Sequence, residues 1–361
     1  MSAFNELNPD QRREAINTSQ RYQALRDARA RVRDCRGSMV WSSTKGHEYL
    51  LRSTYDKKGL RRQISLGARS PATERIKADY ERSRADASAR LAELLQVLER
   101  QAAVNRALGL GRVPLIGARV IRSLDQNGLL GSGIRVLGTN ALYAYESIAG
   151  VHIDPGLTTT EDVDLLLDSR GGLSFVATDD VEEASLLRIL QRVDRSFERT
   201  GQAFCAVNRD GYLVDLIKPM RNPPWKADAS TIGDFPDDLA AAENAGLAWH
   251  ESAPAFEAIA IDEQGEPLRI VTSDPRVFAA HKLWLSKRAD RQPIKRHRDR
   301  EQAEAVAALT TSHLQHLPFD RDALRMLPKD VVDDVAPLFA SKPSPPPAPP
   351  KRAAASRSSR R

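Results

Sequence analysis

The sequence has few cysteines and no long hydrophobic run. Only Cys35 and Cys205 occur among 361 residues, far apart and without metal-ligand spacing, so neither a disulfide framework nor a zinc site is expected. No apolar stretch approaches the length that spans a bilayer, and the N-terminus has no hydrophobic signal segment. We therefore expect a cytoplasmic protein without a membrane partner. A kinase is disfavoured because no Gly-x-x-x-x-Gly-Lys-Ser/Thr motif occurs.

Charge is distributed unevenly along the chain, although the net charge is only +6. Met1–Pro114 has 23 Lys/Arg and 13 Asp/Glu, a net +10, whereas Leu115–Ala340 has 25 and 35, a net −10. Ser341–Arg361 adds six basic residues and no acidic one. An acidic centre suits a site that concentrates cations, and basic ends suit RNA or DNA through phosphate neutralisation. A solvated Arg-rich helix and an unstructured tail would give the same composition, so both interpretations stay open.

The first third of the chain predicts two helices around a small antiparallel sheet. Asn8-Pro9 is a typical helix start, and this helix should end near Arg36. Three short strands are expected at 38–42, 47–54 and 60–66, because hairpin-type turns separate them. Ser70-Pro71 then begins a long helix that reaches about residue 108.

Aromatic and arginine side chains are interleaved in this small sheet, at Trp41, Tyr49, Tyr55, Arg61 and Arg62. Such side chains can stack on bases and hold nucleic acid. They can equally form the core and rim of a small sheet. The sequence leaves both interpretations open.

The most informative motif is Thr-Glu-Asp-Val-Asp-Leu-Leu-Leu at 160–167. Side chains alternate between the faces of a strand, so Asp162 and Asp164 should share one face and the apolar residues the other. Two neighbouring carboxylates repel each other unless a cation lies between them. Mg²⁺ prefers carboxylate oxygens together with substrate phosphates. The pair therefore predicts a divalent-cation site, although an isolated Asp-x-Asp also occurs on solvated strands.

A second acidic position supports this prediction. Gly211-Tyr-Leu-Val-Asp-Leu-Ile-Lys218 places Asp215 in the middle of an apolar strand, where an unpaired carboxylate is costly. A salt bridge to Lys218 or Arg221 would satisfy it, but we favour a third metal ligand.

A strand-to-helix turn is predicted upstream, where Val136–Leu142 reads Val-Leu-Gly-Thr-Asn-Ala-Leu. Gly138 and Thr139 would allow a close approach to phosphates, because the backbone N–H groups at such a turn are free. Together with the acidic strands, this turn indicates nucleotidyl transfer.

These features resemble the nucleotidyltransferases of the DNA polymerase β superfamily. The narrower resemblance is to the bacterial minimal nucleotidyltransferase-like proteins, akin to the toxin nucleotidyltransferases of abortive-infection systems. It rests on Gly-Thr after one strand, Asp-x-Asp on the next and a lone Asp on a third, and it covers roughly Ile116–Leu309. The resemblance implies an α+β fold with a polymerase-β-like mixed sheet and helical cover. A small helical and antiparallel β region and a long helix precede this sheet.

The resemblance also implies roles for individual residues. Asp162, Asp164 and Asp215 would be the catalytic residues and would hold Mg²⁺, with Mn²⁺ as an alternative. Contacts to a nucleoside triphosphate would come from residues near the turn and on two later helices: Gly138, Thr139, Asn140, Lys282, Lys295, Arg298 and Asp299, the last as the partner of Lys282.

The chain departs from the family pattern at two places. Thr139 stands where a Ser is usual, which keeps the hydroxyl and adds a methyl group. The connection from Gly138 to Asp162 is long because it contains the segment Gly150–Gly156. Within it, Asp154 precedes Pro-Gly and is expected to form a turn rather than to bind a metal.

Five regions follow from these patterns: 1–70, a basic helix and three strands; 71–114, a long helix; 115–225, the catalytic core; 226–340, strands and helices that complete the site; and 341–361, a disordered, basic, Pro-rich tail.

The expected reaction moves a nucleoside monophosphate from a triphosphate to a hydroxyl of RNA, a protein or a small molecule. The alternative is a non-catalytic nucleic-acid-binding or regulatory module on the same fold. Expected partners are the triphosphate, RNA or DNA at the basic N-terminal region and tail, and either a cognate antitoxin or a second copy of the chain.

Overall fold

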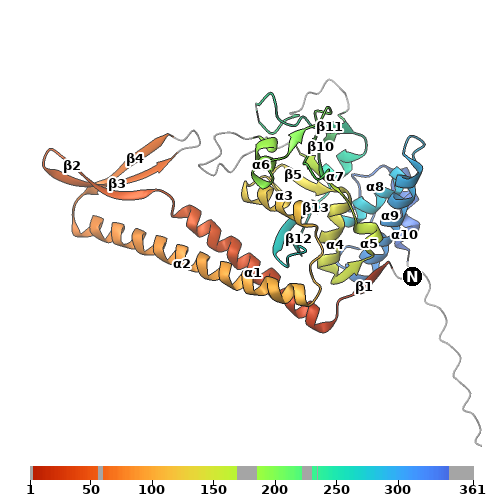
Figure 1. The fold of residues 1–361 in the computed structure, drawn as a ribbon, viewed down its shortest axis with the longest axis horizontal. Helices are drawn as coiled ribbons and strands as arrows, with labels where there is room; N and C mark the ends of the chain where they lie inside the picture. Colours follow the sequence, from red (N-terminus) through yellow and green to blue (C-terminus); the bar gives the residue numbers. More distant parts are fainter. Residues whose placement is uncertain (1–2, 56–59, 169–184, 222–229, 234, 341–361) are drawn as a thin grey trace, which may run out of the picture.

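The computed structural model describes residues 3–55, 60–168, 185–221, 230–233 and 235–340. The predicted tail 341–361 and the predicted division at residue 225 lie outside these ranges. Figure 1 shows a body of strands and helices from which a long, narrow arm extends. No helix within these ranges combines the length and the apolar character needed to cross a bilayer.

The arm is a pair of helices with a three-stranded antiparallel sheet at its outer end (Figure 1). Both helix starts agree with the sequence prediction, because Asn8 and Ser70 each form a capping box with the residue three positions later. The elements of the arm are α1 (Pro9–Asp34), β2 (Ser38–Thr44), β3 (His47–Tyr55), β4 (Arg61–Ala68) and α2 (Pro71–Ala107).

Helices α1 and α2 pack through a small apolar core. Its buried residues are Tyr22, Leu25 and Ala28 from α1 and Leu94 and Leu98 from α2. The long helices of the predicted regions 1–70 and 71–114 thus form one packed pair.

The arm is attached to the body at its base, both where the chain enters the arm and where it leaves it. Before α1, strand β1 (Phe4–Glu6) pairs antiparallel with β6 (Val151–Ile153) of the body. At the end of α2, the buried Asn105 donates a hydrogen bond from Nδ2 to the backbone oxygen of Gly265 (2.8 Å). Asn105 Oδ1 accepts from Thr18 of α1 (3.0 Å), so one side chain joins both helices to the body.

The body is built on a mixed sheet in the order β5-β7-β10-β9-β8, with β11 beside β10. Strand β10 is parallel to β7 and β11 and antiparallel to β9, and β5 is antiparallel to β7. The predicted α+β class with a mixed sheet and helical cover is confirmed. The strands are β5 (Ile134–Leu137), β7 (Asp162–Leu167), β8 (Glu198–Arg199), β9 (Cys205–Val207), β10 (Leu213–Pro219) and β11 (Ala242–Asn244).

One face of this sheet forms the main hydrophobic core. Val163, Leu165 and Leu167 of β7 are fully buried there, together with apolar residues of α3 (Leu115–Gln126) and α6 (Leu186–Val193). Asp162 and Asp164 are only partly buried. The alternation predicted for β7 is therefore correct, and it turns both carboxylates away from the core.

A helical layer covers part of the other face, with a second hydrophobic core of its own. The hairpin β12 (Ala255–Ile261) and β13 (Pro267–Ser273) joins the two layers, because Tyr145 donates a hydrogen bond to Ser273 O (2.9 Å). The helices are η1 (Gly138–Ala141), α4 (Leu142–Ala149), α5 (Pro155–Thr158), α7 (Leu247–Ser252), α8 (Pro275–Ser286), α9 (Pro293–His313) and α10 (Lys329–Phe339).

The segment that lengthens the connection between the two site motifs contains β6 and α5. Asp154 begins α5, where its Oδ1 accepts a hydrogen bond from the N–H of Gly156 (2.8 Å). Asp154 thus forms the turn expected for it and lies outside the acidic strands.

Candidate active site

The sheet places the three predicted carboxylates on one face. In the parallel register of β7 and β10, Asp164 lies directly opposite Asp215, and Asp162 is two positions earlier on β7. Neighbouring strands are about 4.8 Å apart, so Asp164 and Asp215 are immediate cross-strand neighbours. The sequence motif alone predicts that Asp162 and Asp164 share a face, and the strand register shows that Asp215 lies on the same face.

These carboxylates repel one another in a poorly solvated place. Burial, followed by the negative charge of Asp162, raises the pKa of Asp164 to about 6, and the charge of Lys282 opposes this shift. Burial and the charge of Asp162 also raise the pKa of Asp215. A bound cation would relieve both effects, because an opposite charge favours the ionised carboxylates.

Asp215 has an unsatisfied oxygen. Its Oδ1 is buried and has no hydrogen-bond partner among the described residues. On the neighbouring strand β9, Cys205 lies directly opposite. Burial, and then the carboxylate of Asp215, raise the pKa of the Cys205 thiol to about 12, so it stays a neutral donor beside the carboxylate. The salt-bridge alternatives are not formed, since Lys218 pairs with Glu243 and Arg221 with Glu251.

The acidic strands fit a hard divalent cation, but they do not form a finished metal site. In the described part of the chain, no group of three or more His, Cys, Asp or Glu residues is arranged closely enough to hold a metal ion. The fit rests on the oxygen donors, on their mutual repulsion and on the orphan oxygen of Asp215. Metal binding by Asp162, Asp164 and Asp215 therefore stays a prediction.

Gly138 is required at the turn for two geometric reasons. Its φ of +60° lies in the left-handed region, which side chains rarely adopt. A Cβ atom at this position would also lie only 1.9 Å from Asp164 Oδ2. The sequence predicted that a small residue here would allow a close approach, and the group approached is the carboxylate of Asp164. The backbone of η1 begins beside this carboxylate.

The two residues after Gly138 make hydrogen bonds to different partners: Asn140 to strand β7, and Thr139 to helix α9, where one of its donors is the cationic side chain of Arg298. Asn140 donates from Nδ2 to the backbone oxygen of Asp162 (2.7 Å). The Oγ1 of Thr139 accepts from Arg298 (3.4 Å) and from Gln302 (3.3 Å), both on α9. Arg298 also donates to the backbone oxygen of Thr159. The predicted triphosphate contacts Thr139, Asn140 and Arg298 are therefore adjacent, and their contact with a nucleotide stays a prediction.

A buried ion-pair group lies across from the acidic strands. Lys282 of α8 donates to Asp299 Oδ1 (2.8 Å), and Arg291 donates to Asp299 Oδ2 (2.8 Å). Lys282 is 9% exposed and Asp299 is 2% exposed. One carboxylate thus holds two cations in place. The pairing implied by the family resemblance is present, and Arg291 is an additional member.

Lys295 lies on the exposed first turn of α9. Its positive charge acts on Asp215 by lowering the pKa of that carboxyl group. Lys295 therefore lies near enough to Asp215 to act on its charge, and its contact with a nucleotide stays a prediction.

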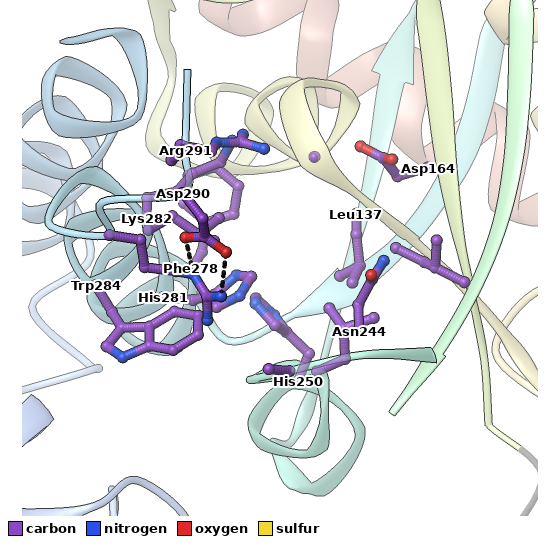
Figure 2. Close-up of a pocket in the computed structure, with 16 residues that line it drawn as sticks. Leu137, Asp164, Asn244, His250, Phe278, His281, Lys282, Trp284, Asp290 and Arg291 are labelled. Atoms are coloured by element: carbon purple, nitrogen blue, oxygen red, sulfur yellow. Dashed lines mark hydrogen bonds and ion pairs between the residues drawn. The ribbon is translucent and has the colours of Figure 1, made fainter. Parts of the chain in front are cut away.

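A cavity of about 350 Å³ lies between the acidic strands and α8. In Figure 2, the carboxylate of Asp164 lies on one side of the open space, while Lys282 and Arg291 lie on the opposite side. Phe278, Trp284, His250 and Asn244 line the rest of the wall. A volume of this size falls in the usual range for ligand sites, and the lining joins charged groups to aromatic rings.

The cavity wall beyond Lys282 and Arg291 carries a further cation, Arg288. Arg288 stacks on Trp284, with its guanidinium carbon 4.7 Å from the ring centroid, and pairs with Asp290 (dashed lines in Figure 2). These three residues form one polar and aromatic corner.

Sequence reasoning missed several residues of the site. Cys205 is brought to Asp215 by an antiparallel register that no local motif reveals. Gln302 reaches Thr139 across 163 positions of sequence. Arg291 stood within the basic run beside Asp299, and its position eight residues earlier was the only available signal.

The comparisons with known proteins agree with this geometry. A family model described as Nucleotidyltransferase matches residues 116–328. A search of curated proteins and a search of solved structures each found no match. The matched segment covers more than half of the chain, and it includes the acidic strands, the Gly138 turn and the Lys282–Asp299 pair but not the arm. On this evidence the chain belongs to the nucleotidyltransferase family.

Proposed function

We propose that this protein is a Mg²⁺-dependent nucleotidyltransferase that moves a nucleoside monophosphate from a triphosphate to an acceptor hydroxyl. The observation that carries this proposal is the cross-strand register of Asp164 with Asp215, which gathers repelling carboxylates beside the Gly138 turn. The family membership supports nucleotidyl transfer in general.

The acidic strands would hold the cation. Asp162, Asp164 and Asp215 would be the oxygen donors, and Asp215 Oδ1 has no competing hydrogen-bond partner in the described part of the chain. When bound, Mg²⁺ would polarise the phosphate oxygens and lower the pKa of the attacking hydroxyl.

The cationic wall would bind the triphosphate. Lys282 and Arg291 face Asp164 across the cavity and are fixed by Asp299. A triphosphate between these walls would place its negative charge next to both cations, which would stabilise the additional charge on the departing pyrophosphate. Arg298, beside Thr139, would contact the same phosphates from the η1 side.

The bond changes are those of an in-line displacement. The acceptor oxygen forms a bond to the α-phosphorus, and the bond from that phosphorus to the pyrophosphate oxygen breaks. The hydroxyl proton would pass to a carboxylate oxygen that the cation leaves free, and Asp215 is the candidate because it lies beside Asp164 on the same face of the sheet.

The direct test is a labelling experiment. The protein is incubated with each of four α-³²P-labelled triphosphates, Mg²⁺ and either RNA or lysate protein. We expect label in a macromolecular or small-molecule product, lost with EDTA and lost in Asp164→Asn. Product formation by Asp164→Asn at the wild-type rate would contradict the assignment.

The second candidate is a non-catalytic binding module. The observation that favours it is that the described carboxylates are not preassembled as a metal site. In that case nucleic acid would bind in a salt-sensitive way without labelled product, and calorimetry would show no Mg²⁺ binding that depends on Asp162 and Asp164.

The resemblance to abortive-infection toxins adds a narrower proposal, that transfer by this protein inhibits growth. Expression in a bacterial host should then slow growth, and Asp164→Asn should abolish the effect. Equal inhibition by both proteins would remove the toxin interpretation and leave the enzymatic one unaffected.

A further inference from the structure

The outer end of the arm is strongly basic. We call β2, β3 and β4 with their flanking residues, 35–55 and 60–70, the tip sheet. Only one acidic residue, Glu48, occurs in these ranges. The basic residues number six: Arg36, Lys45, Arg52, Arg61, Arg62 and Arg69. The family match begins at residue 116, so this charge belongs to a part of the chain outside it.

Two of these basic side chains, those of Lys45 and Arg61, are available to a partner. Lys45 and Arg61 are exposed, and neither forms an ion pair with a described carboxylate. Arg61 instead donates to the hydroxyl of Ser53 (3.0 Å), which steadies its position on the sheet. Arg69 is paired with acids, but its guanidinium carbon also lies 5.2 Å from the ring centroid of Trp41. Exposed cations on a basic sheet suit the phosphate backbone of a nucleic acid.

The apolar residues of the tip sheet do not favour a membrane. The exposed large apolar side chains among the described residues of this sheet are Val40, Leu60 and Ile64, at 39%, 63% and 62%. Val40 pairs with Leu51, whereas Ile64 pairs with the next residue of β3, Arg52. Val40 and Ile64 therefore lie on opposite faces, so the three side chains do not form one apolar surface for lipid insertion.

The base of the arm packs closely against the body. Asn105 joins both helices to the hairpin β12–β13, as described above. Arg26 of α1 adds an ion pair to Glu257 of β12 (3.1 Å). Gly265 approaches so closely that a Cβ there would lie 2.1 Å from the backbone oxygen of Ala102. The base of the arm is thus joined to the body by hydrogen bonds, an ion pair and close backbone packing.

We propose that the tip sheet binds the phosphate backbone of a nucleic acid, and that this nucleic acid is the acceptor of the transfer reaction. The second half of this inference rests on the proposed function; the first half stands on the charge and geometry of the arm alone.

The length of the arm makes the proposal quantitative. Helix α2 has 37 residues and is about 55 Å long at 1.5 Å per residue. Base pairs rise by about 3.4 Å each, so roughly 16 base pairs match the length of the helix. A duplex of that size spans the length of the arm, whereas a nucleoside-sized acceptor does not.

Binding is tested with the full chain by fluorescence anisotropy, without triphosphate or Mg²⁺. The probes are fluorescein-labelled RNA and DNA duplexes of 24 base pairs. We expect Lys45→Glu/Arg61→Glu to weaken binding by at least about tenfold and to lower the slope of log affinity against log salt by about 1–2. The matched control is Arg90→Glu/Arg100→Glu, with the same change in charge on exposed positions of α2 outside the tip sheet. It should bind within about twofold of wild type.

A charge-keeping variant guards against misfolding of the tip sheet. Lys45→Arg/Arg61→Lys should bind as wild type does, because phosphate neutralisation requires charge and no particular base. Three results would overturn the proposal: equal weakening by the tip variant and its control, no binding of either duplex by the wild type, or binding at equal salt to vesicles containing phosphatidylserine in place of nucleic acid. Comparison of the two duplexes shows which nucleic acid is preferred.

The acceptor role is tested by transfer of ³²P-labelled nucleotide to duplexes of 8 and 24 base pairs. Wild type should prefer the longer duplex by about tenfold, and Lys45→Glu/Arg61→Glu should remove that preference while keeping the rate on the shorter one. Binding without any transfer would refute the proposed function and keep the tip sheet as a binding surface. Transfer without length preference would refute the acceptor role and keep the enzyme.

Discussion

The arm and the body of this protein are stabilised in different ways. The body contains two large hydrophobic cores and carries a net charge of −10 over Leu115–Ala340. The two helices of the arm pack through one cluster of five buried apolar residues, and the arm belongs to a region of net charge +10. In the body, apolar packing is extensive enough to hold repelling carboxylates together on β7 and β10. In the arm, helix caps and a few polar contacts maintain a long shape. The difference separates a body that contains the candidate active site from a long, basic arm (Figure 1).

The largest effect should come from the acidic strands. Asp164→Asn removes one proposed cation ligand, and we expect transfer to fall by at least about 1,000-fold, which corresponds to roughly 4 kcal/mol of transition-state stabilisation. The fold should survive, because loss of one negative charge relieves repulsion from Asp162 and Asp215. Steady-state rates together with a thermal melt check both statements. An unfolded variant would mean that Asp164 has a structural role instead.

Core truncations should separate the two regions next. Leu165→Ala in β7 leaves a cavity in a fully buried layer and should lower the free energy of unfolding by about 3–5 kcal/mol. Leu98→Ala in α2, where the side chain is 7% exposed, should cost about 2–3 kcal/mol and leave transfer to a small acceptor unchanged. Urea unfolding and activity assays measure both. An equal loss of activity in the two variants would show that the arm supports the site directly.

Asp164 of the body should contribute one component of the pH dependence of stability. The pKa of Asp164 is raised to about 6 from an ordinary value of 3.8, so between these values the folded state binds more protons than the unfolded state. Stability should therefore fall as pH rises from about 4 to about 6 and stay level above that, by at most about 3 kcal/mol and by less because the side chain is partly exposed.

Asp164→Asn is the control for this pH dependence, since its unfolding free energy should lose this component. The same profile in both proteins would assign the effect to other groups. Saturating Mg²⁺ should also flatten the wild-type profile, because a bound cation favours the ionised carboxylate.

The smallest expected effect concerns the joint between arm and body. Asn105→Ala removes three hydrogen bonds, to Thr18, Gln101 and Gly265, and should cost about 1–2 kcal/mol of stability. Hydrogen exchange should increase at the end of α2, while the Asp164 region keeps its protection. Increased exchange in β7 and β10 as well would mean that the two regions unfold as one unit.

Local features of the fold were predictable from sequence because they depend on neighbouring residues. Asn8 and Ser70 mark helix starts through contacts three positions away, and the period of two in β7 separates Asp162 and Asp164 from the core. The glycine at 138 signals a turn for the same reason. Family resemblance added Lys282 and Asp299, which no local pattern connects.

Other features depend on partners far away in the sequence. The pairing of β1 with β6 joins residues about 150 positions apart, and short strands of three residues give almost no periodic signal. The approach of Cys205 to Asp215 follows from register, which a shift of one residue would reverse. The cavity wall with Trp284 depends on how α8 packs against the sheet, and packing of this kind cannot be read from hydrophobic periodicity.

The β1–β6 pair has a practical consequence for anyone who shortens this gene. The chain leaves the body after β1 and returns to it at Leu110. The arm is therefore an insertion between two points of contact with the body, and β1 would be lost if everything before Leu110 were removed. A version beginning at Leu115 would lose Leu7 and Leu110 from their contact with Ile261 and would leave the hydrogen-bonding edge of β6 open. Excision of the outer portion alone, with the two helices rejoined by a short turn, would keep the edge covered and is the sounder route to a compact enzyme.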